Sequence, residues 1–220
     1  HSIVEYKGQW YIFYHHNDYS PEFDKNRSAR IDTIGFNPDG TIIKVIPTLR
    51  GVGNSDARTQ IQIDRYSEIA PTASIAYLNE ANKFDGWKTL FKKSGAWVRY
   101  NRVEFGQEPV KQVKFRILAP KGAKLEVSIA GGKSIATVNV PRSNNWEIVS
   151  APVKKSPTGL QDLKITLKSG QAEVDWMIFD AKPWTAGGMQ TGKYRNLLAE
   201  LGYKQADIDA KLNDVFNALF

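Results

Sequence analysis

The sequence predicts a mainly β protein whose central part is an antiparallel β-sandwich. Between residues 60 and 181, short runs of alternating apolar and polar residues follow one another without helical periodicity. Gly, Pro and Asn clusters separate these runs, for example at Pro120–Gly122 and Ser156–Gly159. A smaller antiparallel sheet is expected over residues 1–50 and a helical hairpin over residues 193–220.

The composition bounds the class of protein. The chain has 220 residues, no Cys and a formal net charge of +7. The absence of Cys excludes a disulfide framework, a thiolate metal site and a Cys nucleophile. Lys and Arg are interspersed with acids and not clustered, so no nucleic acid is expected as a partner. No apolar run has membrane-spanning length and no signal peptide begins the chain, which opens on His1 and is expected to be a fragment.

Residues 1–50 have β character. Ile3–Tyr14 is expected to form two strands joined by a tight turn at Lys7–Gly8. A third strand is expected at Ser28–Ile34, and a fourth after the Asp-Gly turn at residues 39–40. One sheet of four short strands cannot bury both of its faces by itself.

This first block resembles a known enzyme family. The matching pieces are His1–Val4, Gly8–His15, Asn26–Ser28 and Phe36–Ile42. They look like the last blade of the five-bladed propeller of glycoside hydrolase family 43, whose members are arabinofuranosidases and β-xylosidases. The resemblance implies that His1 is the histidine at the propeller axis that helps to hold a central cation. It also places the catalytic acids on blades upstream, so this block is expected to be inactive on its own.

The stretch Gly95–Gly106 is the centre of the predicted sandwich. As a strand, it places on one face Trp97, Arg99, Asn101 and Val103. An aromatic ring beside long polar side chains is typical of a sugar-binding surface, because an indole stacks on the C–H faces of a pyranose. The alternative is a structural strand in which Tyr100 is core and Trp97 lies half-buried at the rim.

A second resemblance covers residues 57–181. The pieces that carry it, in order, are Ile61–Tyr66, Ser94–Gly106, Thr137–Trp146 and Val174–Phe179. They resemble the family 6 carbohydrate-binding modules. The resemblance implies a jelly-roll-like sandwich that binds xylan, cellulose or mixed-linkage glucans, and such modules often follow family 43 catalytic domains.

The same resemblance implies carbohydrate-binding residues in two clefts. Trp146 matches one aromatic wall of a loop-end cleft, and Phe91 is the nearest match to the opposite wall. Glu173 stands where the family usually has an Asn that hydrogen-bonds the sugar, and a carboxylate accepts but does not donate. Trp97 matches the aromatic of a second cleft, with Arg99 beside it. The Phe91 and Trp146 cleft is expected to be the working site, and a purely core role for Trp146 is the alternative.

A structural calcium ion is also implied by the resemblance. The matching oxygen donors are Gln62, Asp64 and Asp180, near the first strand and the end of the last one. Calcium takes hard oxygen ligands, several of them often backbone carbonyls, so three side chains are enough for a candidate site. Only two of the three are anionic.

Two further segments flank the sandwich. Residues 51–59 and 182–192 are rich in Gly and small polar residues and are expected to be linkers. Residues 193–220 carry a short helix pattern that ends at Gly202 and then a second amphipathic pattern. This segment resembles the N-terminal helices of a glycoside hydrolase family 8 xylanase.

These observations predict a non-catalytic carbohydrate-binding region of a secreted or cell-surface modular glycoside hydrolase. Its expected partners are a xylan or arabinoxylan polysaccharide and other catalytic domains of the same polypeptide, with no membrane contact. One rival is an arabinofuranosidase or β-xylosidase in its own right, using acids that the sequence does not pair: Glu68, Glu80, Glu104 and Asp175. The other rival is a module that contacts another protein through Trp97 and Trp146.

Overall fold

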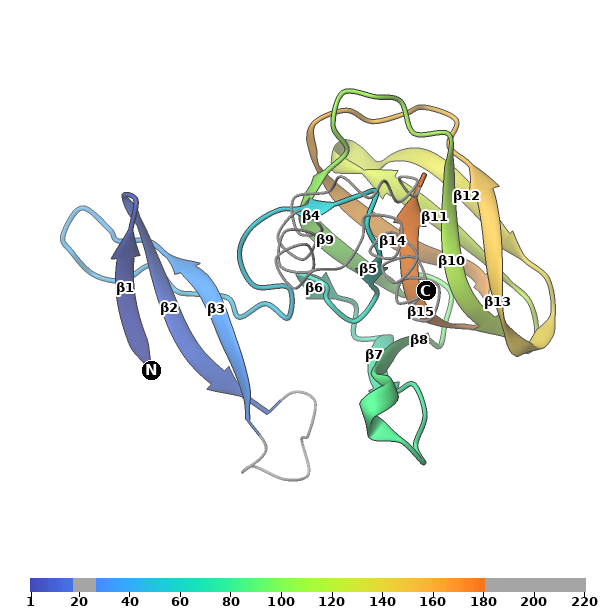
Figure 1. Cartoon of the computed structure of the whole chain (residues 1–220), viewed down its shortest axis with the longest axis horizontal. Helices are drawn as coiled ribbons and strands as arrows, with labels where there is room; N and C mark the ends of the chain where they lie inside the picture. Colours follow the sequence, from blue (N-terminus) through green and yellow to red (C-terminus); the bar gives the residue numbers. More distant parts are fainter. Residues whose placement is uncertain (18–26, 181–220) are drawn as a thin grey trace, which may run out of the picture. The chain divides into compact units, whose positions relative to one another are not determined.

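The computed structural model describes residues 1–17 and 27–180, in which all regular structure is β apart from two short 3-10 turns. These turns are η1 (Lys83–Asp85) and η2 (Ala130–Gly132). The strands form one three-stranded and two six-stranded sheets (Figure 1). None of the described residues belongs to a helix long and apolar enough to span a membrane.

The N-terminal sheet contains β1 (Ser2–Tyr6), β2 (Gln9–His16) and β3 (Ser28–Ile34), in that order and antiparallel. Lys7 and Gly8 both have positive φ, 51° and 76°, as a tight hairpin turn requires, so the predicted turn is confirmed. The expected fourth strand is absent from the described residues, where only an isolated bridge joins Phe36 to Ile42. This part of the chain therefore forms three strands.

Two larger sheets make the sandwich, and each is named here after one of its strands. The β10 sheet has the order β13-β10-β15-β8-β7, with β5 paired to β15, and the β9 sheet has the order β12-β11-β14-β9-β4, with β6 paired to β9. The β10 sheet comprises β5 (Ile61–Gln62), β7 (Ala73–Tyr77), β8 (Trp87–Phe91), β10 (Gln112–Ala119), β13 (Ser143–Pro152) and β15 (Ala172–Phe179). The β9 sheet comprises β4 (Ser55–Asp56), β6 (Glu68–Ile69), β9 (Trp97–Glu104), β11 (Ala123–Ile129), β12 (Lys133–Val140) and β14 (Leu160–Gly170).

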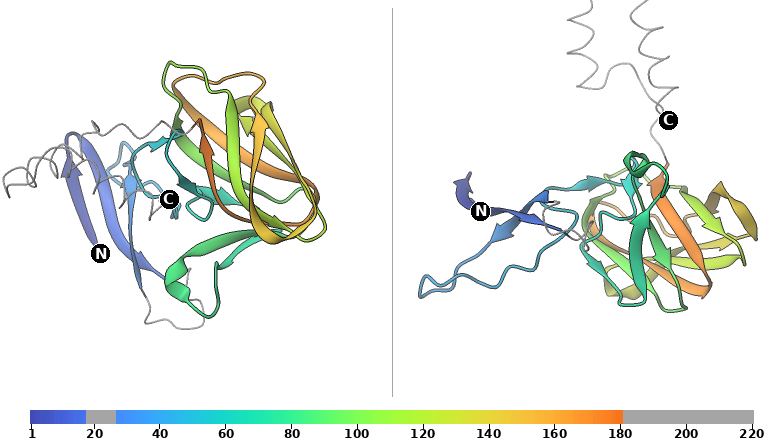
Figure 2. Two further views of the ribbon diagram at one scale, coloured as in Figure 1. Left: turned by 45° about the vertical axis from the view of Figure 1, so that its right-hand side comes forward. Right: turned by 90° about the horizontal axis from the view of Figure 1, so that it is seen from below.

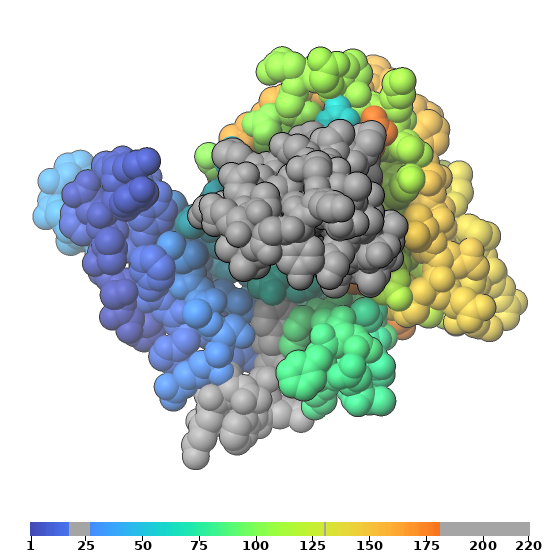
Figure 3. Space-filling view, viewed as in Figure 1, coloured from blue at the N-terminus to red at the C-terminus, as the bar shows by residue number. Residues whose placement is uncertain are grey.

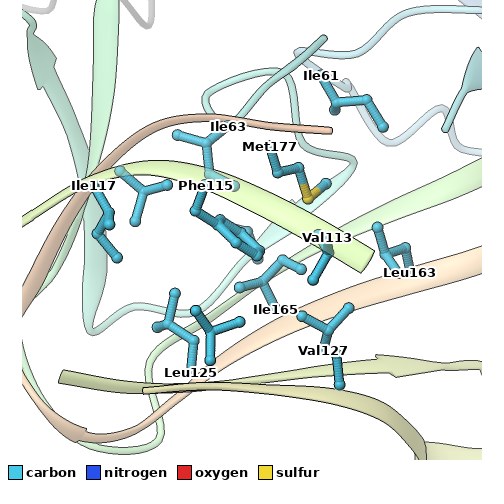
Figure 4. Close-up of a cluster of buried hydrophobic side chains, with 14 of the residues drawn as sticks. Ile61, Ile63, Val113, Phe115, Ile117, Leu125, Val127, Leu163, Ile165 and Met177 are labelled. Carbon is cyan, nitrogen blue, oxygen red and sulfur yellow. The ribbon is translucent and has the colours of Figure 1, made fainter. Parts of the chain in front are cut away.

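The core lies between these two sheets, which pack face to face (Figure 2). Alternate residues of each central strand point inward because strand side chains alternate between faces. Figure 4 shows Phe115 and Met177 of the β10 sheet among Leu125, Leu163 and Ile165 of the β9 sheet, and all five are fully buried. The intervening residues of the same strands are consequently held on the two outer faces.

β9 departs from simple alternation at one residue. Arg102 has a φ of +61°, and the register between β9 and β14 shifts between Gln161 and Leu163. This is the signature of a β-bulge, in which one extra residue reverses the facing of those that follow. Val103 is therefore buried in the core, and the prediction that it shares the face of Trp97 and Arg99 is wrong.

Two predictions about the ends of the sandwich need correction. Part of the expected linker 51–59 belongs to the sandwich, because Ser55–Asp56 is a strand parallel to β9 and Ala57 is fully buried. The fold class is mainly β with a β-sandwich, and the described chain contains no α-helix. The helical hairpin expected at residues 193–220 and the linker expected at 182–192 lie outside the described residues.

The hydroxyl of Thr89 is buried in β8 without a hydrogen-bond partner among the described residues. A buried polar group that lacks a partner costs about 1–3 kcal/mol. Replacing Thr89 by Val removes the hydroxyl and keeps the shape, so Thr89→Val should raise the free energy of unfolding by about 1 kcal/mol. Urea denaturation measures the change. Thr158→Val, at an exposed site, is the matched control and should change little, and equal effects of the two substitutions would contradict the argument.

Candidate functional site

Trp146 lies in β13, at the edge of the β10 sheet, and is partly exposed. The guanidinium carbon of Arg116, on the outer face of neighbouring β10, lies 4.9 Å from the centre of its ring. The yellow β12–β13 region forms open surface in Figure 3. Trp146 therefore stands on the outside of the sandwich with a cation against one ring face, and a purely core role does not fit it.

Glu173 lies on the outer face of β15, opposite Leu90 of β8 and Leu118 of β10. Its carboxylate oxygen Oε2 lies 2.8 Å from Nζ of Lys88, whose side chain also projects outward from β8. The exposed fractions of the Glu173 and Lys88 side chains are 33% and 20%, so both side chains are partly accessible to solvent. Sequence reasoning missed Lys88 because the strand that carries it was not predicted.

These side chains lie on the outer face of four neighbouring strands of the β10 sheet, in a staggered line because Arg116 is opposite Trp176 and Glu173 is opposite Leu118. From the edge inward, the line contains Trp146 of β13, Arg116 of β10, Glu173 of β15 and Lys88 of β8, and we call it the outer row. Neighbouring strands lie about 4.8 Å apart, so the row crosses roughly 14 Å of sheet surface. The arrangement offers an aromatic face at one end and a paired donor and acceptor at the other.

Phe91 is not part of this row. It is only 1% exposed and lies on the inner face of β8, opposite Ala73 and Ala172. The prediction that Phe91 is the second aromatic wall is therefore wrong, because alternation along β8 turns Lys88 and Leu90 outward and Phe91 into the core.

Another pair of aromatics lies on the β7–β8 hairpin, which stands out from the sandwich in Figures 1 and 3. The rings of Tyr77 and Trp87 stack with their centres 4.2 Å apart, and Lys83 Nζ lies 4.8 Å from the centre of the Tyr77 ring. Phe84, in the loop between the two strands, is 99% exposed. Tyr77 and Trp87 are directly opposite each other in the hairpin. Sequence reasoning missed this pair because neither strand was predicted.

The outer face of the β9 sheet carries the other predicted aromatic site. Trp97 is partly exposed, and Lys164 Nζ of β14 lies 4.5 Å from the centre of its ring. Arg99 makes ion pairs with Glu68 at 3.0 Å and with Asp162 at 2.7 Å. The hydrogen bond that Arg99 donates to Asp162, together with the negative charges of Glu68 and Asp162, raises the pKa of Arg99. Trp97 and Arg99 therefore share a face as predicted, and the Arg99 side chain is already engaged by two carboxylates.

The three predicted calcium ligands do not meet. Gln62 pairs with Trp176 of β15, and Asp180 follows four residues later, about 13 Å further along an extended chain. Asp64 lies on the other side of Gln62, near Asp175. The described residues contain no group of three acidic or His side chains arranged to hold a metal. A calcium ion held jointly by Gln62, Asp64 and Asp180 does not fit this arrangement.

The remaining predicted residues have separate surroundings. His1 stacks on His15, with ring centres 5.2 Å apart. Among the acids considered for catalysis, Glu68 pairs with Arg99, and Glu104 accepts a hydrogen bond from the Gly106 amide at 2.8 Å. Asp175 pairs with Arg116. Glu80 is exposed in the β7–β8 loop. Glu68, Glu104 and Asp175 are thus engaged in three separate structural contacts.

The chain matches the carbohydrate binding module family 6 over residues 67–181, just over half of its length. The match covers the sandwich from β6 to its last strand and contains the outer row. The chain belongs to this family, and carbohydrate binding is the function that the family defines. No match was found among curated proteins.

Solved structures share the fold. A glycoside hydrolase family 43 arabinoxylan arabinofuranohydrolase from Bacillus subtilis, in complex with cellotetraose, aligns over 82% of this chain with a TM-score of 0.57 and 20% identity. The aligned part is 40% of that enzyme. CsCBM6-3 from Clostridium stercorarium, in complex with cellobiose, aligns over 59% of this chain and 98% of its own with a TM-score of 0.52 and 22% identity.

A family 6 module from Clostridium cellulolyticum, in complex with xylose, also aligns with this chain. It covers 57% of this chain and 98% of its own, with a TM-score of 0.50 and 22% identity. At these identities the similarities establish the fold. The resemblance to a family 8 xylanase suggested for residues 193–220 is not supported by these findings.

Burial raises the pKa of Asp175, while the Arg116 hydrogen bond and charge oppose this rise and Asp64 adds to it. A raised pKa in the folded state stabilises the protein below about pH 4, and this contribution is lost as the pH rises through the raised value. The unfolding free energy of the wild type relative to Asp175→Asn should therefore decline between about pH 4 and 7, measured by urea denaturation.

The surface residue Asp39 provides a control of opposite sign. Hydrogen bonds from Thr41 lower the pKa of Asp39, so its contribution is present above the ordinary value and lost as the pH falls. The unfolding free energy of the wild type relative to Asp39→Asn should therefore decrease as the pH falls below about 4. The raised pKa would be contradicted if the unfolding free energy of the wild type relative to Asp175→Asn stayed constant or rose between about pH 4 and 7.

Proposed function

We propose that the sandwich binds a neutral plant cell-wall polysaccharide, xylan or arabinoxylan, through the outer row. The observation that carries the proposal is the row itself, which aligns Trp146 with the Lys88–Glu173 pair on one outer face of a family 6 sandwich. Structures with the same fold are complexes with cellobiose and with xylose, which supports a β-linked glucan or xylan as the ligand class.

Stacking on Trp146 supplies the apolar part of recognition. Arg116 lies against the ring of Trp146, which is partly exposed, and a pyranose ring would stack on the ring face away from Arg116. By analogy with aromatic pairs, one such stacked contact contributes about 1 kcal/mol. The guanidinium also fixes the orientation of the indole, so less side-chain entropy is lost when a sugar binds.

The Lys88–Glu173 pair supplies the polar part. A carboxylate alone accepts hydrogen bonds from sugar hydroxyls but offers no donor. The Lys88 ammonium at 2.8 Å carries three donors, so the pair presents both kinds of group, as an amide would. Lys88 of the neighbouring strand β8 thereby supplies the donor that Glu173 lacks in comparison with the usual Asn.

Residues 1–50 are proposed to be the terminal blade of a family 43 propeller. The three-stranded sheet exposes apolar side chains on both faces, with Val4 and Phe13 on one and Ile3 and Trp10 on the other. Such a sheet requires further structure against each face. The alignment with the family 43 enzyme, which extends well beyond the sandwich, supports this assignment.

The parent protein is accordingly proposed to be a secreted or cell-surface modular hydrolase that degrades hemicellulose. In it the sandwich would keep catalytic domains of the same polypeptide near their substrate. The 220 residues themselves are proposed to be non-catalytic, since a glycosidase needs a positioned pair of carboxylates. Release of reducing sugar from xylan by this chain would overturn that part of the proposal.

Affinity electrophoresis in soluble xylan tests the binding claim. The wild type should be retarded, and Trp146→Ala should weaken binding about fivefold because it removes the stacking face. Trp97→Ala should have a smaller effect, since Lys164 lies against that ring. Phe84→Ala, on the exposed hairpin loop, is the control and should match the wild type. Unchanged mobility of the wild type in xylan, arabinoxylan and β-glucan would overturn carbohydrate binding through this face and favour a protein-interaction role.

The role of Lys88 is tested by comparing two substitutions. Lys88→Met leaves Glu173 without its donor, whereas Glu173→Gln retains an acceptor and adds donors of its own. We expect Lys88→Met to lower xylan affinity several-fold and Glu173→Gln to lower it less, as measured by isothermal titration calorimetry. Both should stay within about 1 kcal/mol of wild-type stability because the pair is partly exposed. Wild-type affinity in Lys88→Met would exclude Lys88 from the site.

A further inference from the structure

Arg58 lies where three segments of the sandwich come together. Its Nη2 donates to the carbonyl oxygen of Glu108 at 2.7 Å and is 3.3 Å from that of Pro109. Its Nη1 is 3.9 Å from Oδ2 of Asp180, at the end of β15. The side chains of Arg58 and Asp180 are only 13% and 18% exposed, so this contact is largely withdrawn from water.

Asp180 is held by the same junction. Its two carboxylate oxygens accept hydrogen bonds from the backbone amides of Lys111, at 2.5 Å, and Gln112, at 3.0 Å. Ala57, the residue before Arg58, also contacts the end of β15, because its carbonyl accepts a hydrogen bond from the Phe179 amide at 2.8 Å. The start of the sandwich, the segment before β10 and the end of β15 therefore converge on one guanidinium.

The atoms that surround Arg58 are of the kind that calcium takes. Two backbone carbonyls and a carboxylate are hard oxygen ligands, suited to a divalent cation. Here a planar guanidinium with several N–H donors meets these oxygens and brings a positive charge that needs no external ion. The residues that resemble calcium ligands, Gln62 and Asp64, do not reach Asp180.

We propose that Arg58 is a built-in cation that closes the sandwich in place of a structural calcium ion. The guanidinium satisfies the Glu108 and Pro109 carbonyls and offsets the charge of Asp180 at the end of the last strand. The stability of the fold is accordingly independent of calcium. The role of Arg58 concerns the stability of the fold, so its test does not depend on whether the sandwich binds sugar.

Thermal unfolding of the whole chain by circular dichroism tests the proposal in two arms. In the first arm, the wild type is scanned in excess EDTA and in millimolar calcium chloride. The melting temperature should be the same in both, within about 1 °C. A melting temperature that falls in EDTA and recovers with calcium would overturn the proposal.

The second arm removes the guanidinium. Arg58→Met keeps much of the apolar stem and should lower the melting temperature by about 5 °C, because the carbonyls and Asp180 lose their cation. Arg142→Met removes an exposed arginine and should change it little. Equal melting temperatures for the two variants would overturn the role of Arg58. If Arg58→Met does not fold, Arg58→Lys keeps the charge without the planar fork and should melt below the wild type, and a wild-type melting temperature for Arg58→Lys would overturn the role of the guanidinium.

Discussion

The ion pair between Arg116 and Asp175 connects the core of the sandwich to its outer row. Asp175 is 6% exposed and lies at an irregularity of β15, where Arg116 pairs with Trp176 but the next residue of β10 pairs with Val174. The extra residue leaves Asp175 beside Arg116, which binds its carboxylate. Because a buried carboxylate without a cation is costly, Arg116 is fixed in place, and its position in turn orients Trp146.

Several other cations on the outer faces of the sandwich are also paired with acids. On the β9 sheet, Arg99 lies between two carboxylates, and Lys168 lies 3.3 Å from Glu126. On the β10 sheet, the charges of Lys88 and Arg116 are each matched by an acid. Matched donors and acceptors suit neutral hydroxyl groups, whereas an anionic ligand would have to compete with carboxylates already bound.

Much of the fold follows from features that a sequence shows directly. The strand pattern at Val110–Leu118 and the Gly and Pro turn after it predicted a central strand, and the structure has β10 at Gln112–Ala119. The prediction failed where the cause is non-local. β7 and β8 are stabilised by pairing with each other and with β15, and their short patterns are weak alone. Phe91 was therefore assigned to the surface without knowledge of its strand.

The candidate site was predictable only where it depends on local alternation along one strand. Trp97 and Arg99 share a face because the alternation between them is regular, but the bulge at Arg102 needs a backbone conformation that ordinary residues seldom adopt. Nothing in the local sequence marks it. Lys88 and Arg58 act on partners 85 and 122 residues away in the chain, Glu173 and Asp180, and spacing rules do not reach that far.

The two exposed indoles differ in the cation that lies against each ring. Arg116 is held against Trp146 by a buried carboxylate, so it does not leave the ring when a ligand arrives. Lys164 has no carboxylate partner among the described residues and has a flexible four-carbon stem, so it is free to move over Trp97. A sugar at Trp97 must displace or share the ring with this mobile cation. A sugar at Trp146 meets a ring whose orientation is already fixed, and the entropy lost on binding is smaller there.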